Sequence, residues 1–174
     1  IDVPNSAIAL AVNEITRDRN KVLIGSGAGT ALLTGARCSP NTVHWTYDTW
    51  AYGHGLARAI AGQGVKSVFF ITADYAFGHD LEKQFADELV KQGGKVLGSA
   101  RHPIGASDFS SLLVQAQSSH ADAVAFVADS RPDQRDANRR SWDNLNANLK
   151  ALHLERAPVV LQYNKRDLPE AVAV

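Results

Sequence analysis

Hydroxyl groups and glycines gather in one short segment of the chain, which makes it the first candidate for binding chemistry. The segment Ser26-Gly27-Ala28-Gly29-Thr30 follows a strand expected at residues 22–25. Its glycines would let the backbone approach a ligand closely, and the residues at its two ends supply hydroxyls. We therefore predict that Ser26, Gly27, Ala28 and Thr30 bind a ligand. A dinucleotide loop is not supported, because Thr30 stands where the third glycine of that motif is required.

Two further candidate positions lie where helices are expected to begin. Asn5 and Ser6 precede an apolar stripe with helical spacing, so they would offer backbone N–H groups and a hydroxyl to a carboxylate. Tyr75 lies just past another expected strand and could add an aromatic wall and a hydroxyl. The alternative interpretation is that Asn5, Ser6 and Thr30 merely cap helices and that Tyr75 is an ordinary loop aromatic.

A third motif, Asn164-Lys165-Arg166-Asp167, carries groups that can recognise guanine. Asp167 can accept two hydrogen bonds from the base, the Lys165 stem can lie on it, and Asn164 can brace the loop. The chain contains no G-x-x-x-x-G-K-[ST] phosphate loop, however, and base contacts alone rarely give useful affinity. The alternative for this run is a turn after a strand, with Asp167 as a helix cap.

Other kinds of chemistry lack the residues they need. The six histidines show no metal-ligand spacing, there is no G-x-S-x-G elbow, and Cys38 is the only cysteine. We therefore predict no enzymatic activity, no catalytic residues, no metal and no cofactor. A formal net charge of +0 gives no reason to expect nucleic acid or an anionic membrane as partner, and no apolar run is long enough to insert into a membrane.

The elements that must position these residues alternate along the chain. Apolar runs predict strands, and stripes of helical period lie between most of them. The expected strands are 22–25, 43–46, 67–72, 95–100, 123–128 and 159–163. This order predicts an α/β fold, a parallel β-sheet layered between helices with right-handed crossovers. The stripe Trp142, Leu145, Leu149 and Leu152 would lay a last helix on that sheet, with strands 123–127 and 159–162 paired in it.

Residues of about 2–128 resemble the type I periplasmic binding proteins of the branched-chain amino-acid ABC-transporter class. The resemblance is carried by the order and spacing of several segments: Val3-Pro4-Asn5-Ser6, the run 25–30, the run 41–48, the run 69–78, Asp108-Phe109-Ser110 and Ala121-Asp122-Ala123-Val124. In that family two α/β lobes close on a small ligand. The resemblance thus implies a periplasmic-binding-protein type I, or flavodoxin-like, lobe at 48–174 and an incomplete lobe at 1–47.

The resemblance also implies partners and a compartment. The expected ligand is an amino acid or another small carboxylate, the membrane permease components of an ABC transporter are possible partners, and the compartment is the periplasm. No signal peptide is present at Ile1. An incomplete lobe leaves apolar faces and sheet edges uncovered, so we also expect homodimerisation through Val22–Ile24 or the helix around Ala7–Ile15.

Residues of about 126–174 resemble a different family, the bacterial gliding-motility class of small GTPases. The matching parts are Val127-Ala128-Asp129-Ser130, a charged helix, and the run 160–169 that contains the Asn-Lys-x-Asp motif. The charged fraction also rises after Ala128. Two alternatives to solute binding follow. One is a GTPase-like guanine-nucleotide binder without a phosphate loop, which would be cytoplasmic. The other is an engineered product of fold recombination that has no ligand at all. The two resemblances together lead to the hypothesis of a chimera, engineered or otherwise, in which one β-α-β piece of the binding protein is replaced by a geometrically similar one.

Overall fold

The structure is a computed structural model that describes residues 3–106, 108–128, 135–151 and 159–163. Its contacts group the chain into two compact units. Unit 1 comprises residues 1–63 and 75–92, and unit 2 comprises residues 64–74 and 93–174. Unit 1 contains helices that follow residue 47 together with residues 1–47. The lobe boundary expected at 47/48 stays a prediction.

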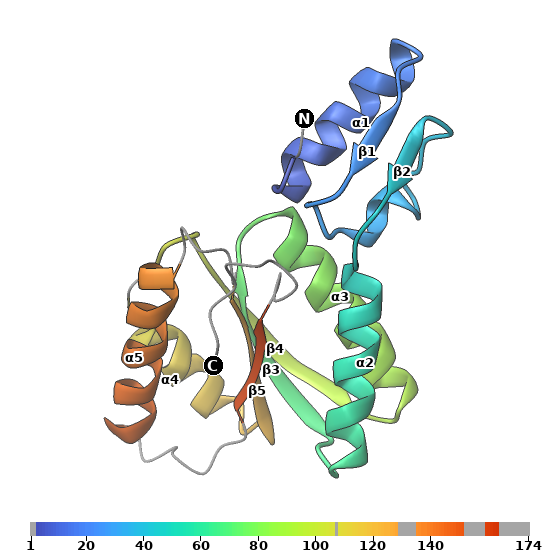
Figure 1. Ribbon diagram of the computed structural model, residues 1–174. Helices are drawn as coiled ribbons and strands as arrows, with labels where there is room; N and C mark the ends of the chain where they lie inside the picture. The colour runs from blue at the N-terminus through green and yellow to red at the C-terminus, as the bar shows by residue number, and fades with distance from the viewer. Residues whose placement is uncertain (1–2, 107, 129–134, 152–158, 164–174) are drawn as a thin grey trace. The chain divides into compact units, whose positions relative to one another are not determined.

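Unit 1 opens with a helix packed on a small sheet. Helix α1 (Ser6–Asp18) is followed by strand β1 (Leu23–Gly25), the 3-10 helix η1 (Ala31–Leu33) and strand β2 (Thr42–His44). The two strands pair in parallel, with Leu23 opposite Thr42 and Gly25 opposite His44. Ala9, Leu10, Ala28 and Leu33 form the buried core between these elements. Figure 1 shows α1 running alongside β1 and β2.

The rest of unit 1 is a pair of helices, α2 (Thr49–Gly62) and α3 (Ala76–Lys91). They approach closely because Gly53 has no side chain: a Cβ built there would lie 2.7 Å from Gln84 Cβ and 2.7 Å from the Phe85 backbone nitrogen. The sequence predicts helix α3 from an apolar stripe of Leu81, Phe85, Leu89 and Val90; the first three are buried, whereas Val90 is exposed. No comparable stripe predicted α2, because glycine takes the place of a large apolar side chain at its contact with α3.

Unit 2 is built on a four-stranded parallel sheet in the order β4-β3-β5-β6. The strands are β3 (Ser67–Ala73), β4 (Lys95–His102), β5 (Ala123–Ala128) and β6 (Val159–Tyr163), and the helices are α4 (Ser110–Ser118) and α5 (Arg135–Ala151). The predicted placing of 123–127 inside the sheet is confirmed, since β5 pairs with both β3 and β6. The predicted pairing of 159–162 in the same sheet is confirmed as well.

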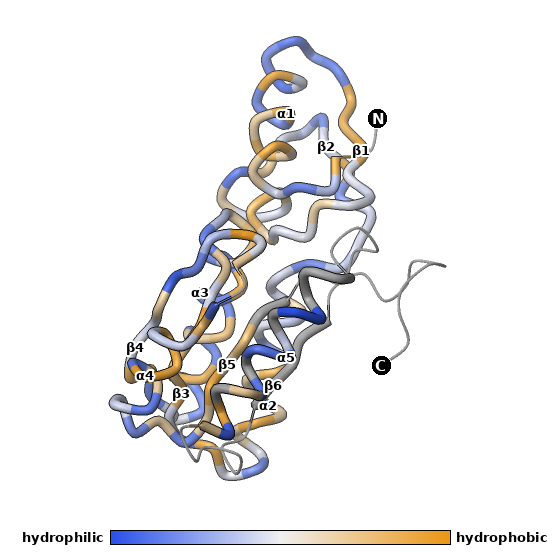
Figure 2. The backbone as a smooth tube through the Cα atoms, turned by 90° about the vertical axis from the view of Figure 1, so that its left-hand side faces the viewer, coloured by the Kyte–Doolittle hydropathy of each residue, from blue (hydrophilic) through white to orange (hydrophobic). Residues whose placement is uncertain are grey.

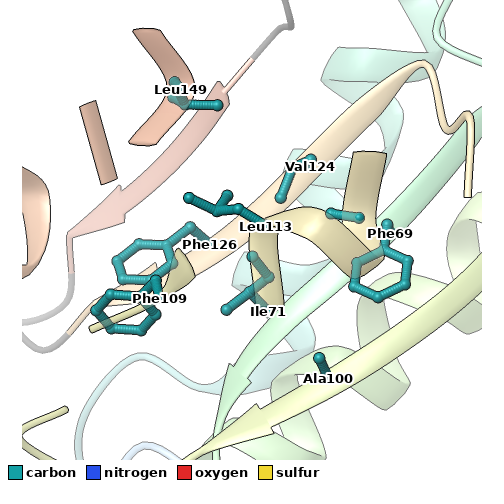
Figure 3. Close-up of a cluster of buried hydrophobic side chains, with 9 residues drawn as sticks. Phe69, Ile71, Ala100, Phe109, Leu113, Val124, Phe126 and Leu149 are labelled. Atoms are coloured by element: carbon teal, nitrogen blue, oxygen red, sulfur yellow. The ribbon is translucent and has the colours of Figure 1, made fainter. Parts of the chain in front are cut away.

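One face of this sheet and the two helices enclose an apolar core. Figure 3 shows Phe69 and Ile71 from β3, Val124 and Phe126 from β5, and Leu113 from α4 converging on it. Leu149 contributes from α5, and Trp142 packs against the cluster. Leu152 lies outside the described residues, and the side chain of Leu145 is not among those described. The part of the α5 stripe that is described therefore faces the sheet, as predicted.

The central strands are apolar on both faces. Val68 and Phe70 alternate with Phe69 and Ile71 along β3, and all four are buried. In Figure 2 β5 is drawn in the orange of hydrophobic residues. This pattern is typical of parallel strands that are covered on both sides.

Exposed apolar side chains mark the surfaces on which homodimerisation was expected. Val22 and Ile24 at β1, and Ile8 and Ile15 on α1, are all more than half exposed. Their exposure is compatible with a contact between two copies, and homodimerisation stays a prediction. Among the described residues, no helix is both long and apolar enough to cross a membrane.

Candidate ligand-binding site

All seven predicted ligand-binding residues belong to unit 1. They come from three places in the chain: the start of α1, the loop after β1, and the start of α3. One apolar cluster brings these places together, because Val3, Ala28 and Ala76 all take part in it. Val3 lies two positions before Asn5, Ala28 is itself a predicted site residue, and Ala76 directly follows Tyr75. The predicted site residues are therefore gathered around a single cluster.

The start of α1 is already capped by its own side chain. Asn5 is the N-cap, and its Oδ1 accepts hydrogen bonds from the N–H groups of Ala7 at 2.9 Å and Ile8 at 3.2 Å. Two of the N–H groups that were expected to face a ligand therefore have an acceptor within the chain. Ser6 is buried, whereas Asn5 is half-buried.

The loop after β1 presents one end to solvent and buries the other. Ser26 is exposed and Gly27 is half-buried, but Ala28 is fully buried in the apolar cluster. The Ala28 carbonyl oxygen lies 2.6 Å from His44 Nε2, which ties the loop to β2. A Cβ at Gly29 would lie 3.0 Å from Phe77 Cε2, so a larger residue there would require the Phe77 ring to shift.

Thr30 uses its hydroxyl within the fold. The hydroxyl donates to Asp80 Oδ2 at 2.6 Å, and its oxygen accepts from the Leu32 N–H at 3.3 Å as the N-cap of η1. Thr30 and Asp80 are both buried. Thr30 therefore acts as a cap, the role that the alternative interpretation gave it, and its hydroxyl is bonded within the fold.

Tyr75 begins the helix that flanks the loop. It is the N-cap residue of α3, its side chain is half-buried, and its side chain makes no capping hydrogen bond. Its ring stacks on Phe77 with ring centroids 6.0 Å apart. Since Phe77 also contacts Gly29, Tyr75 and the loop share a common neighbour. Tyr75, Ser26, Gly27 and Asn5 are the predicted site residues that are not buried.

Sequence analysis missed a buried carboxylate in unit 1, that of Asp80. Asp80 Oδ2 accepts from the hydroxyls of Thr30 and Thr49, each at 2.6 Å, and from the Ala31 N–H at 2.9 Å. Asp80 Oδ1 accepts from Gln84 Nε2 at 3.2 Å. A buried carboxylate of this kind is tolerated because several donors replace the water it has lost.

A second buried carboxylate, Glu88, lies two turns further along α3. Its Oε1 accepts from Arg58 Nε at 2.6 Å and from Gln92 Nε2 at 2.9 Å, and its Oε2 lies 3.5 Å from His54 Nε2. The hydrogen bond from Arg58 is the main cause that holds the pKa of Glu88 below its ordinary value. The two acids and Gln84 repeat every fourth position beside the apolar stripe, but exposed residues on a helix share this spacing, so it did not mark the acids as buried.

The remaining sequence candidates lie elsewhere. Asn164, Lys165 and Asp167 fall outside the described residues. Within the part of the chain that the structure describes, no three His, Cys, Asp or Glu side chains come together in a way that could hold a metal ion.

The C-terminal resemblance is supported by a sequence match to a curated protein. Over 55 residues the chain is 51% identical to the mutual gliding-motility protein MglA of Myxococcus xanthus. The match covers 30% of this chain and 28% of that protein. It supports the inference of a segment similar to a small GTPase.

Solved structures of binding proteins superimpose on most of the chain. A periplasmic binding protein from Burkholderia mallei is 44% identical, with a TM-score of 0.75, over 90% of this chain and 39% of its own. A branched-chain amino-acid ABC-transporter ligand-binding protein from Burkholderia xenovorans is 26% identical, with a TM-score of 0.70, over 94% and 42%. A solute-binding protein of an ABC transporter from R. palustris, in complex with 4-hydroxybenzoate, shares the fold at 21% identity, with a TM-score of 0.72 over 97% and 44%.

The chain thus spans less than half the length of these solved relatives. Their fold confirms the predicted class, parallel sheets flanked by helices as in type I periplasmic binding proteins. A model of the periplasmic binding protein family matches residues 1–132. The chain belongs to the periplasmic binding protein family.

Proposed function

We propose that this chain binds a small solute bearing a carboxylate, without catalysis, as part of an ABC-transporter substrate-binding protein. The observation that carries the proposal is that the exposed Ser26, the half-buried Gly27 and the half-buried Tyr75 lie around one apolar cluster in a chain of the periplasmic binding protein family. Hydroxyls and open backbone beside an aromatic ring are suited to a carboxylate with an apolar body.

The relatives narrow the choice of ligand class. The R. palustris protein holds 4-hydroxybenzoate, and the B. xenovorans protein belongs to a branched-chain amino-acid transporter. Both ligand types combine a carboxylate with an apolar body. For this chain we propose the same class, a location in the periplasm, and permease components as partners.

Calorimetric titration of the purified protein with leucine and with 4-hydroxybenzoate tests the proposal. At least one of them should bind, and Ser26→Ala and Tyr75→Phe should each weaken that binding. A matched control for the hydroxyl lies away from the loop: Ser118→Ala removes a hydroxyl bonded within α4. Binding that this control weakens as much as the site variants would contradict the proposed site.

The GTPase-like segment has a structural part in this proposal. The superposition on the B. mallei protein covers 90% of the 174 residues of the chain. This is more residues than the 132 that the family model matches. Part of the segment after residue 132 therefore occupies positions that the binding protein also has. We infer that a β-α-β piece of GTPase origin replaces the equivalent piece of a binding protein, so that the chain is a chimera.

Nucleotide hydrolysis by the purified protein would contradict the proposal that the chain binds a solute without catalysis. No phosphate loop is present in the sequence to hold the phosphates and magnesium of GTP. We expect no GTP hydrolysis above background from purified protein. Hydrolysis that disappears in Asp167→Ala would make the C-terminal segment functional as a GTPase.

A further inference from the structure

The two buried carboxylates of α3 differ in the segments of the chain to which they are hydrogen-bonded. Glu88 bonds to Arg58 of α2 and to Gln92 just after α3, so its bonds stay within the helix pair. Asp80 also bonds to α2, through the Thr49 hydroxyl, but its other donors at Oδ2 come from Thr30 and Ala31. Thr30 and Ala31 stand at the end of the loop that begins with Ser26. Asp80 is therefore the acid that connects this loop to both helices.

We propose that Asp80 is a positioning residue for ligand binding: it fixes the shape of the loop 26–30 and ties that loop to the helix that begins at Tyr75. This inference rests on the proposed function of the same site. Asp80 is buried, so its effect on a ligand is exerted through the loop and not by contact.

The geometry at Asp80 Oδ2 explains why one residue can do this. Three donors converge on a single oxygen, and the Ala31 N–H is shared with Thr49 Oγ1 at 2.9 Å. The Thr49 N–H also donates to the Gly29 carbonyl oxygen at 2.8 Å, so both sides of the loop's end are held. Charged acceptors make stronger and more directional hydrogen bonds than neutral ones. Loss of the charge loosens several loop contacts at once.

The same acid sets the distance between the loop and Tyr75. Helix α3 carries Asp80 five residues after Tyr75, and between them Phe77 contacts both Gly29 and the Tyr75 ring. A loop that shifts away from Asp80 moves away from Phe77 as well. Ser26, Gly27 and Tyr75 would then no longer have the spacing that suits one ligand.

The helix pair provides a matched control. Asp80→Asn and Glu88→Gln each remove the charge of a buried carboxylate on the same face of α3, and both should lower the melting temperature. Titration with leucine and 4-hydroxybenzoate should separate them. We expect Asp80→Asn to raise the dissociation constant about tenfold, which corresponds to about 1.4 kcal/mol. Glu88→Gln should leave it within about twofold, since its bonds do not reach the loop. Equal effects of the two variants on the dissociation constant would overturn the inference.

A measurement without ligand distinguishes failure of this inference from failure of the proposed function. The hydrogen-exchange rate of the Ala31 amide, divided by that of the Leu89 amide, reports loosening of the loop apart from global unfolding. The ratio should rise in Asp80→Asn and not in Glu88→Gln. If the wild-type chain binds neither probe, the proposed ligand class is wrong, and the exchange ratio alone decides the role of Asp80.

Thr49 gives a second pair of variants in case Asp80→Asn fails to fold. Thr49→Val keeps the shape of the side chain but removes the hydroxyl that bonds to Asp80 and Ala31. Thr49→Ser keeps the hydroxyl. The exchange ratio should rise in Thr49→Val and return toward the wild-type value in Thr49→Ser. An unchanged ratio in Thr49→Val would contradict the inference.

Discussion

Unit 1 and unit 2 hold their elements together by different means. The core of unit 2 is made of apolar side chains such as Phe109, Ile71 and Leu113, and burial of this kind has no preferred direction. In unit 1, α2 and α3 are joined by hydrogen bonds to Asp80 and Glu88. Hydrogen bonds to a buried acid fix the angles and distances between the segments they join. The geometry of unit 1 near the candidate site is therefore more narrowly constrained than that of the apolar core of unit 2.

The two units thus meet different requirements, stability in the sheet core and a fixed geometry at the loop. A sheet core gains from every apolar atom it buries, and small shifts are tolerated if volume is kept. A loop that binds a ligand needs a defined shape, and a few hydrogen bonds to specific partners provide it.

Removal of residues 129–174 should abolish the cooperative fold of unit 2. The truncation deletes β6, which pairs with β5 along Val124–Ala128, and α5, which supplies Leu149 to the core. We expect the remaining chain to be insoluble or molten, as judged by near-UV circular dichroism and by binding of a hydrophobic dye. A soluble truncated chain with an unchanged cooperative melt would show that the segment is an appendage.

Phe109→Ala should cost about 3–5 kcal/mol of the free energy of unfolding. Phe109 is fully buried, and its ring meets those of Phe126 and His102 edge to face at centroid distances of 5.2 and 4.9 Å. Urea unfolding measures the loss. Phe109→Leu retains most of the apolar volume and should cost clearly less. If the two substitutions cost the same, the aromatic volume would not be what stabilises this core.

Gly53→Ala should destabilise unit 1 by about 1–3 kcal/mol, because the added methyl group forces α2 away from α3. Gly55 is a matched control in the same helix, since a Cβ built there meets nothing within 4 Å. Gly55→Ala should stabilise the helix by about 0.5–1 kcal/mol. Thermal unfolding of the two variants should therefore shift in opposite directions, and shifts of the same sign would refute the close helix contact.

His102 gives unit 2 a small dependence on pH. Burial is the main cause that lowers the pKa of His102 from its ordinary value of 6.5. Within the described residues its Nε2 atom has no hydrogen-bond partner, while its Nδ1 faces the Pro103 carbonyl oxygen at 2.9 Å. The unfolded chain thus binds a proton at a higher pH than the folded chain. Stability from this residue is complete above about pH 6.5 and declines as the pH falls below that value toward the folded pKa.

The measurement is the free energy of unfolding at pH 7.5 and at pH 5.5, for the wild-type protein and for His102→Phe. The decrease on acidification should be smaller in His102→Phe, because that variant has no imidazole to protonate. An identical decrease in both proteins would show that other groups cause the acid sensitivity.

Much of the fold could be predicted because the strands consist almost entirely of apolar residues. The run Ala123–Ala128 matches the strand residue for residue, and Val159–Tyr163 does as well. Continuous apolar runs of this length have few alternatives in a chain that alternates strands and helices. Helix α2 was expected only as the helix that precedes the strand at 67–72, and no apolar stripe marked it, since its closest contact with α3 is made by the backbone at Gly53.

The sequence identified residues of a candidate site but not the buried acid beside them. Glycines and hydroxyls indicated the loop as a place where backbone approaches a ligand, which stays a prediction, and the structure shows Gly29 packed close to Phe77. Asp80 could not be found, because one acid beside an apolar stripe looks like an ordinary solvent-facing residue. Its partners Thr30 and Thr49 stand 50 and 31 positions away in the chain, and only the folded structure brings them to it.

The close contact at Gly53 has a consequence for the order of folding. Helix α3 alone would expose an apolar stripe together with two acids that lack their donors, so the isolated helix gains little from forming. Docking of α2 supplies Thr49 to one acid and Arg58 to the other, and Gly53 permits the approach between them. The two helices should therefore consolidate in a single kinetic step, in which substitutions at Gly53 and Glu88 change the folding rate by the same fraction of their effect on stability.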